Sequence, residues 1–149
     1  LGKWISTTQI TDATLHNLFD VVTGDENAAS DVEYRCIFIH NAHATLTWLG
    51  PVVWLSAETA GGANIAIAID GVAASVIGAT VAQADEVVNE GTAPTGEAFS
   101  SPTTKATGLA LADLPAGQCR AIWLRRTAAN SAALDNDDVT IRVEGDTQA

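Results

Sequence analysis

The chain has 149 residues, a hydrophobic fraction of 47% and only 17% charged residues, which is typical of a single globular domain. Its 18 acidic and 7 basic residues give a net charge of −11, which argues against binding to nucleic acid or to an anionic membrane surface. The sequence has no apolar run of about 18 residues, so it predicts no transmembrane helix.

The first 30 residues are the least regular part of the sequence. Residues 11–19 offer an Asp or Thr N-cap and a few apolar positions, which fits one short helical turn. An extended arm fits equally well, because Thr and Val are frequent and no sustained period of 3.6 residues is present. Residues 24–31 are polar and predict a loop. We therefore divide the chain into an N-terminal arm and loop, residues 1–30, and a single β-sandwich domain, residues 31–149.

From residue 32 onward, strand-like segments alternate with turn-rich ones, which is typical of a β-sandwich or barrel. Gly50–Pro51 predicts a turn and Asp70–Gly71 predicts a hairpin. A long loop is expected at residues 90–104, with Phe99 anchoring it to the core. The predicted strands are residues 32–40, 44–49, 52–57, 64–69, 75–81, 106–111, 118–127 and 139–144. The predicted fold is all-β: a jelly-roll or immunoglobulin-like β-sandwich with an extended N-terminal arm.

The two longest predicted strands, residues 32–40 and 118–127, carry apolar side chains on both faces. Alternation along a strand puts Ile122 and Trp123 on opposite faces of the later one. We therefore expect both strands to be central in a sheet. One face of each would lie in the core, and the other would be covered by the arm, a loop or another subunit.

No combination of residues predicts a catalytic, cofactor or metal site, so the chain is not expected to be an enzyme. His40 and His43 frame a turn, and no third ligand stands near them in the sequence. The acidic loops at residues 25–31 and 135–138 carry oxygens that calcium prefers. Their spacing does not match the twelve-residue calcium loop, so we interpret them as solvated turns.

Cys36 and Cys119 are open to two interpretations. They could form an inter-sheet disulfide like that of immunoglobulin domains, with Trp48 or Trp54 packed against it. They could instead be two small buried thiols, and we favour this interpretation. Trp48 and Trp54 flank a predicted turn, and an exposed indole there would suit stacking on a sugar ring.

Six segments carry a resemblance to a known class of proteins. They are residues 19–24, 31–36, 40–41, 102–109, 114–118 and 122–128. They resemble small virion-associated proteins encoded by tailed bacteriophages, and the likeness covers most of residues 19–146. Proteins of this class are usually capsid decoration (cement) proteins, or other head or tail accessories, built as jelly-roll or immunoglobulin-like sandwiches.

The resemblance implies a structural protein of the virion. We expect a capsid decoration protein that binds the major capsid protein on the capsid surface, assembles in the host cytoplasm and associates with itself as a dimer or trimer. The alternatives are a tail or collar accessory protein, or an extracellular glycan-binding module. Neither nucleic acid nor a membrane is expected as a partner. The predicted contact residues are Trp4, Ile5, Leu18 and Phe19 in the arm, with Arg125 and Arg126 at the end of the later long strand.

Overall fold

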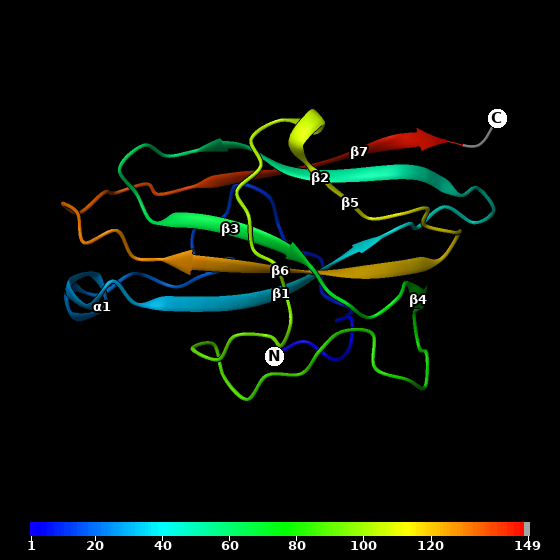
Figure 1. Cartoon of the computed structure of the whole chain (residues 1–149), viewed down its shortest axis with the longest axis horizontal. Coiled ribbons are helices and arrows are strands. Elements are labelled where there is room, and N and C mark those ends of the chain that lie inside the picture. The colour runs from blue at the N-terminus through cyan, green and yellow to red at the C-terminus, as the bar shows by residue number, and fades with distance from the viewer. Residues whose placement is uncertain (148–149) are drawn as a thin grey trace.

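The computed structural model describes residues 1–147 as two antiparallel sheets packed together (Figure 1). Sheet I contains β1 (Val32–His40), β6 (Gln118–Thr127), β3 (Asn64–Ile69) and the two-residue β4 (Ser75–Val76). Sheet II contains β5 (Leu109–Ala110), β2 (Trp48–Glu58) and β7 (Val139–Thr147). The helical elements are α1 (Gly24–Ala29) and one 3-10 turn, η1 (Lys105–Thr107). The predicted all-β sandwich is confirmed, while its jelly-roll or immunoglobulin type stays a prediction.

The main hydrophobic core lies between the two sheets. Ile122 and Leu124 of β6 are fully buried there, on the face opposite to Trp123, as the two-residue period predicts. Partly buried side chains from β1 and β7 close the core at the outer strands. Burying an aliphatic side chain of this size contributes about 1.5–3 kcal/mol, so this cluster supplies much of the stability. Its buried members are Val53, Leu55, Ile65, Ile67, Leu111, Ile122 and Leu124.

Three strands of sheet I, β1, β3 and β6, have the predicted bounds. The predicted turn at Gly50–Pro51 is wrong, because both residues lie inside the continuous strand β2. Gly50 adopts a left-handed conformation with φ 52°, and its N–H donates to Asp113 Oδ1 at 2.8 Å. The pairing of β2 with β7 shifts by one register step between Leu49 and Val52. The two residues therefore form a bulge and not a turn.

The predicted hairpin at Asp70–Gly71 is also wrong. The strands on either side, β3 and β4, do not pair with each other, and both pair with β6. The Asp70 side chain accepts hydrogen bonds from the backbone N–H groups of Val72 and Asp85, which directs the chain away from the sheet. The predicted strand at residues 75–81 is accordingly reduced to β4, and the one at 106–111 to β5.

Two further expectations are corrected. The polar segment predicted as a loop contains α1, which begins with a capping box: Thr23 and Glu26 each bond to the other's backbone N–H. These bonds lower the pKa of Glu26. Strand β1 is not central, because in the order β1–β6–β3 it lies at the edge of sheet I. No helix in residues 1–147 is long and apolar enough to cross a membrane.

Candidate functional site

The outer face of sheet I is covered by the chain itself. The segment of residues 70–100 and the first five residues run along the lower side of the molecule, below β1 and β6 (Figure 1). They bury Trp123, which lies on the face of β6 that points away from sheet II. The sequence predicted that a loop, an arm or another subunit would cover this face. In the structure, a loop and the N-terminal residues cover it.

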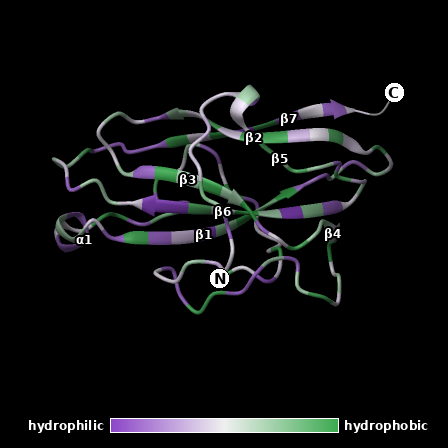
Figure 2. Ribbon diagram, in the orientation of Figure 1, coloured by the Kyte–Doolittle hydropathy of each residue, from purple (hydrophilic) through white to green (hydrophobic). Residues whose placement is uncertain are grey.

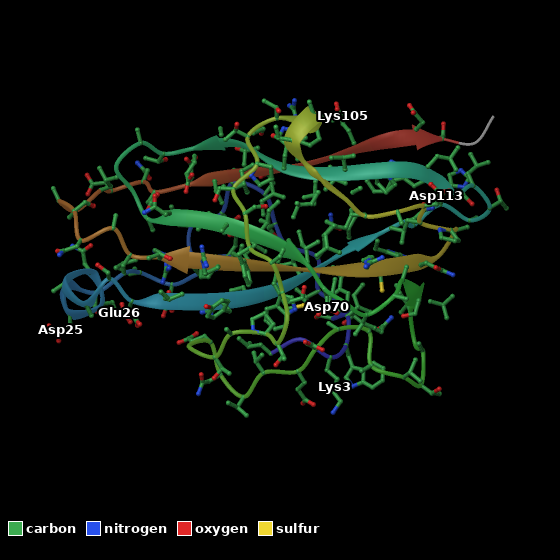
Figure 3. All side chains as sticks on the ribbon, in the orientation of Figure 1. Lys3, Asp25, Glu26, Asp70, Lys105 and Asp113 are labelled. Atoms are coloured by element: carbon green, nitrogen blue, oxygen red, sulfur yellow. The ribbon has the colours of Figure 1, made fainter. Side chains whose placement is uncertain are left out.

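Asp70 is the anchor of this cover. Its side chain is fully buried, and it lies between sheet I and the segment that carries Lys3 (Figure 3). Its Oδ2 accepts hydrogen bonds from Trp123 Nε1 at 2.7 Å and from the Asp85 N–H at 2.9 Å. Its Oδ1 accepts a third from the Val72 N–H at 2.7 Å. A buried carboxylate is tolerated when donors surround it, so Asp70 has a structural role here.

The first residues of the chain are docked on this cover. The Leu1 amino group donates to the Val87 carbonyl at 2.7 Å, and the Lys3 N–H donates to the Asp85 carbonyl at 3.0 Å. Gly2 makes the closest approach, since a Cβ added there would lie 2.0 Å from the Asp85 oxygen and 3.0 Å from the Trp123 ring. Gly2 is also left-handed, with φ 83°, so two independent constraints favour glycine at this position.

Gln83 connects the N-terminal residues to β4. Its backbone N–H donates to the Lys3 carbonyl at 2.7 Å, and its side-chain amide donates to the Val76 carbonyl at 3.0 Å. The same amide reaches Cys119 Sγ at 3.2 Å. Gln83 is buried, whereas the apolar side chains around it point outward. We call this group the Trp4 patch: Trp4, Val76, Ile77 and Val81, which are 42%, 52%, 50% and 67% exposed.

The Trp4 patch is the candidate interaction surface. Hydrophobic stretches of ribbon occur in this loop region beside β4, outside the core of the sandwich (Figure 2). Single exposed apolar residues are common on proteins, but several of them on segments joined by hydrogen bonds, with a Trp among them, are typical of a contact surface. The sequence singled out Trp4 and its half-buried neighbour Ile5, but it did not reveal Val76, Ile77 and Val81, which join the patch only through the fold.

Three of the other predicted contact residues make their contacts inside the chain. Leu18 and Phe19 are half-buried and pack against the core. Arg126 is buried, forms an ion pair with Glu33 and a longer one of 3.3 Å with Asp20, and stacks over the Phe19 ring at 4.8 Å. These contacts hold the three side chains against the sandwich, and Leu18 and Phe19 remain partly exposed.

Arg125 and Phe99 form a second internal contact, on the outer face of sheet I. The Arg125 guanidinium lies 5.2 Å from the centre of the Phe99 ring, and this ring packs edge-on against Tyr34 at 5.6 Å. Phe99 therefore anchors the long loop, as expected, although its contacts lie on the outside of the sheet and not in the main core. The half-buried Arg125 takes part in that anchorage.

One group of carboxylates comes together in the cover of sheet I. Oxygens of Asp70, Asp85 and Glu97 lie within 4.8 Å of one another. Burial raises the pKa of Glu97, as do the negative charges of Asp70 and Asp85, while a hydrogen bond from the Gly71 N–H acts in the opposite direction. Because internal N–H donors bind both Asp70 oxygens, the group holds the loop on the sheet and offers few unused acceptors at its centre.

The two cysteines are free thiols. They lie on β1 and β6, where Cys36 is opposite Trp123 and Cys119 is opposite His40, so they are four positions apart along the ladder. Burial raises the pKa of Cys36 to about 12 and also raises that of Cys119. A thiolate is the reactive form, so both groups are poor nucleophiles in the folded chain.

The turn that contains the two histidines is held by Asn41. The buried Asn41 amide donates to the Leu46 and Leu114 carbonyls, both at 2.8 Å. His43 Nδ1 accepts hydrogen bonds from two backbone N–H groups of the same turn. The Asn41 and His43 side chains therefore serve the local structure, and His40 is the last residue of β1.

The two tryptophans considered for sugar stacking are not presented on an open surface. Trp54 is only 5% exposed, and Trp48 is half-buried. A hollow of about 160 Å³ beside Trp48 is also lined by Asn41 and His43. The Asn41 amide and His43 Nδ1 already form hydrogen bonds within the turn, so few free polar groups are left in the hollow to orient a sugar.

In comparisons with known proteins, no protein family, no curated protein and no solved structure matches this chain.

Proposed function

We propose that this chain is a capsid decoration protein of a tailed bacteriophage, which binds the major capsid protein on the outside of the head and stabilises the shell. The proposal rests on the resemblance of residues 19–146 to virion-associated proteins and on the Trp4 patch. It also includes self-association as a dimer or trimer, and location on the virion after assembly in the host cytoplasm. A tail or collar accessory with the same contact surface is the alternative.

The Trp4 patch is the observation that carries the proposal. Its residues come from the N-terminal segment and from β4 and the loop after it, which Gln83 connects by hydrogen bonds to the Lys3 and Val76 carbonyls. A surface held in this way loses little conformational entropy on binding. An interface of standard size buries roughly 800 Å² per partner, and a central Trp is a typical source of much of its binding energy.

Charge favours a partner with a basic surface. The chain carries a net charge of −11, and several of its few cations are already paired internally. Lys3 binds Glu86 at 2.7 Å, Arg35 binds Glu90 at 2.6 Å and Arg126 binds Glu33. Many carboxylates therefore remain to attract a cationic partner, which would increase the association rate and make binding sensitive to salt.

Co-sedimentation with expanded heads that lack this chain tests the proposal. The double variant Trp4→Ser, Val81→Ser removes the centre of the patch, and we expect a roughly 30-fold or greater loss of affinity, the size of a typical hot spot. The matched control is Val88→Ser, which removes an 89% exposed apolar residue outside the patch. Deleting the whole N-terminal segment is less informative, because it would also uncover Trp123.

Three results are decisive. Loss of head binding in the double variant, with wild-type binding by the control and unchanged thermal unfolding, would support the proposal. Binding of the double variant at wild-type affinity would show that the patch is not the contact surface. Binding of the wild-type chain to purified tails and not to heads would replace decoration by the accessory role.

A further inference from the structure

Strand β7 is a long open edge in the part of the chain that the structure describes. Within residues 1–147 it pairs with β2 alone, and in Figure 1 it lies in the upper part of the molecule together with β2. Two other edges are partly bonded within the chain: β3 exchanges two backbone hydrogen bonds with Ser100, and the Tyr34 N–H of β1, which also has nine residues, donates to the Glu90 carbonyl. β5 has only two residues. An edge of nine residues is a template for another strand.

The hydrogen-bonding direction of β7 follows from its partner β2. The Leu55 N–H donates to the Pro102 carbonyl, on the side of β2 away from β7, and Leu55 lies opposite Ile141 in the register. Residues of an antiparallel pair alternate between bonding to the partner and pointing away from it. The backbone groups of Ile141 and Val143 therefore point outward, while those of Arg142 point toward Trp54.

The side chains of β7 are also only partly buried or lack ion-pair partners. Ile141 and Val143 pack against the main core, but both are only partly buried. Arg142 is exposed, and none of the ion pairs formed within residues 1–147 involves it. Glu144 is half-exposed and contacts Lys105 at 3.6 Å, which leaves room for a second cation.

We propose that β7 binds β7 of a second copy of this chain, in an antiparallel pair centred on Val143. This centre pairs two outward-pointing residues, as the backbone requires, and it places Arg142 of each copy opposite Glu144 of the other. Centring on Ile141 would put Arg142 opposite Thr140, and centring on Gly145 would put Glu144 opposite Asp146. Only the Val143 register pairs opposite charges twice.

The pairing is isologous, because both copies use the same surface. It joins the two copies of sheet II into one continuous six-stranded sheet and covers the partly exposed Ile141 and Val143. It specifies the self-association that the proposed function includes, but it does not depend on head binding, since neither the Trp4 patch nor its partner takes part. The two hypotheses are therefore tested separately.

Charge exchange at Arg142 and Glu144, followed by analytical ultracentrifugation of the full chain, tests the pairing. Arg142→Glu and Glu144→Arg each create two like-charged pairs, and we expect each to raise the dissociation constant of the dimer by roughly tenfold or more. An equimolar mixture of the two variants restores two pairs of opposite charges, one of them with its signs reversed, so it should form a heterodimer of near wild-type affinity. Lys3→Glu and Asp25→Arg change the net charge equally elsewhere and should leave the dimer intact.

A backbone variant gives an independent check. Val143→Pro removes the outward N–H without removing a bond to β2, so it should yield a monomer whose circular dichroism matches that of the wild type. A wild-type chain that sediments as a monomer at every attainable concentration would overturn the proposal. A dimer that is unaffected by the charge exchange, with no preference for heterodimers in the mixture, would overturn it as well.

Discussion

The two late strands β6 and β7 have similar lengths but very different surroundings. β6 has neighbours on both edges, the main core on one face and the buried Asp70 cover on the other. β7 has a neighbour on one edge, and its residues alternate between half-buried and exposed from Val139 to Asp146. β6 pairs in unbroken register with β1 and β3, whereas the β2–β7 ladder has two register shifts. Length alone therefore does not distinguish the strand that holds the fold together from the strand that is available for contacts.

The side chains explain the difference. On its outer face β6 carries Cys119, Ala121 and Trp123, and small residues allow a loop to approach a large ring closely. On its outer face β7 carries Thr140, Arg142 and Glu144, which remain solvated. Burial on both faces is typical of the central strand of a fold. Alternation of half-buried and exposed side chains beside an unpaired edge is the pattern on which the proposed pairing of β7 rests.

Replacing Trp123 should have the largest effect. Trp123→Ala leaves a large cavity on the outer face of β6 and removes a donor from the buried Asp70, so we expect the free energy of unfolding to fall by about 3–5 kcal/mol. Denaturation in urea measures this loss of stability. Trp4→Ala is the matched control and should change stability by less than about 1 kcal/mol, because its ring is substantially exposed. Equal losses at the two positions would contradict the proposed cover.

The buried ion pair at the end of β6 gives the next largest effect. Arg126→Met leaves the Glu33 carboxylate buried without its partner, and we expect a loss of about 3 kcal/mol. The double variant Arg126→Met, Glu33→Leu should recover most of that loss, because no uncompensated charge remains. Urea denaturation of the two variants measures this recovery, and a double variant less stable than the single one would show that the pair itself is strongly stabilising.

Gly2 tests how the N-terminal residues are held. Gly2→Ala places a Cβ against the Asp85 carbonyl and in a left-handed conformation, so the first residues should detach at a cost of about 1–3 kcal/mol. Limited proteolysis would then cut the segment faster. Gly24→Ala is the matched control, since a Cβ there meets nothing within 4 Å. Equal cutting rates would mean that the segment is not docked through Gly2.

The pH dependence of stability should show a smaller effect of Cys36. Its pKa rises from the ordinary 9.0 to about 12 on folding, so the protonated thiol is the form that the fold favours. Its contribution is complete below pH 9 and is lost as the pH rises toward 12. Relative to Cys36→Ala, the wild type should lose stability over that range. Parallel curves for the two proteins would contradict the burial of this thiol.

The sequence correctly predicted the strands that are determined by the β-propensity of their own residues. β1 and β6 combine β-branched and aromatic residues, β3 alternates Ile with Ala, and the bounds of all three were predicted correctly. It failed at Gly50–Pro51 and Asp70–Gly71, where distant partners decide: Asp113 accepts the Gly50 N–H, and Asp85 and Trp123 both bond to Asp70. Turn preferences depend on neighbouring residues, so they do not reveal contacts with residues far away in the sequence.

The candidate surfaces were predictable to a smaller degree. Trp4 stood out as a large apolar residue in an irregular segment, and it does lie at the surface. Arg126 stood out equally, but Glu33 and Asp20 reach it from elsewhere in the chain and bury it. The open edge of β7 is invisible in the sequence, because strand order determines which strand lies at an edge.

Amide hydrogen exchange at rising protein concentration tests the contrast between β6 and β7 most directly. The outward amides of Ile141 and Val143 should exchange quickly in dilute protein and more slowly as the concentration rises, while the amides of β6 stay equally protected throughout. Exchange in β7 that does not depend on concentration would contradict the conclusion that this strand is an open edge for assembly.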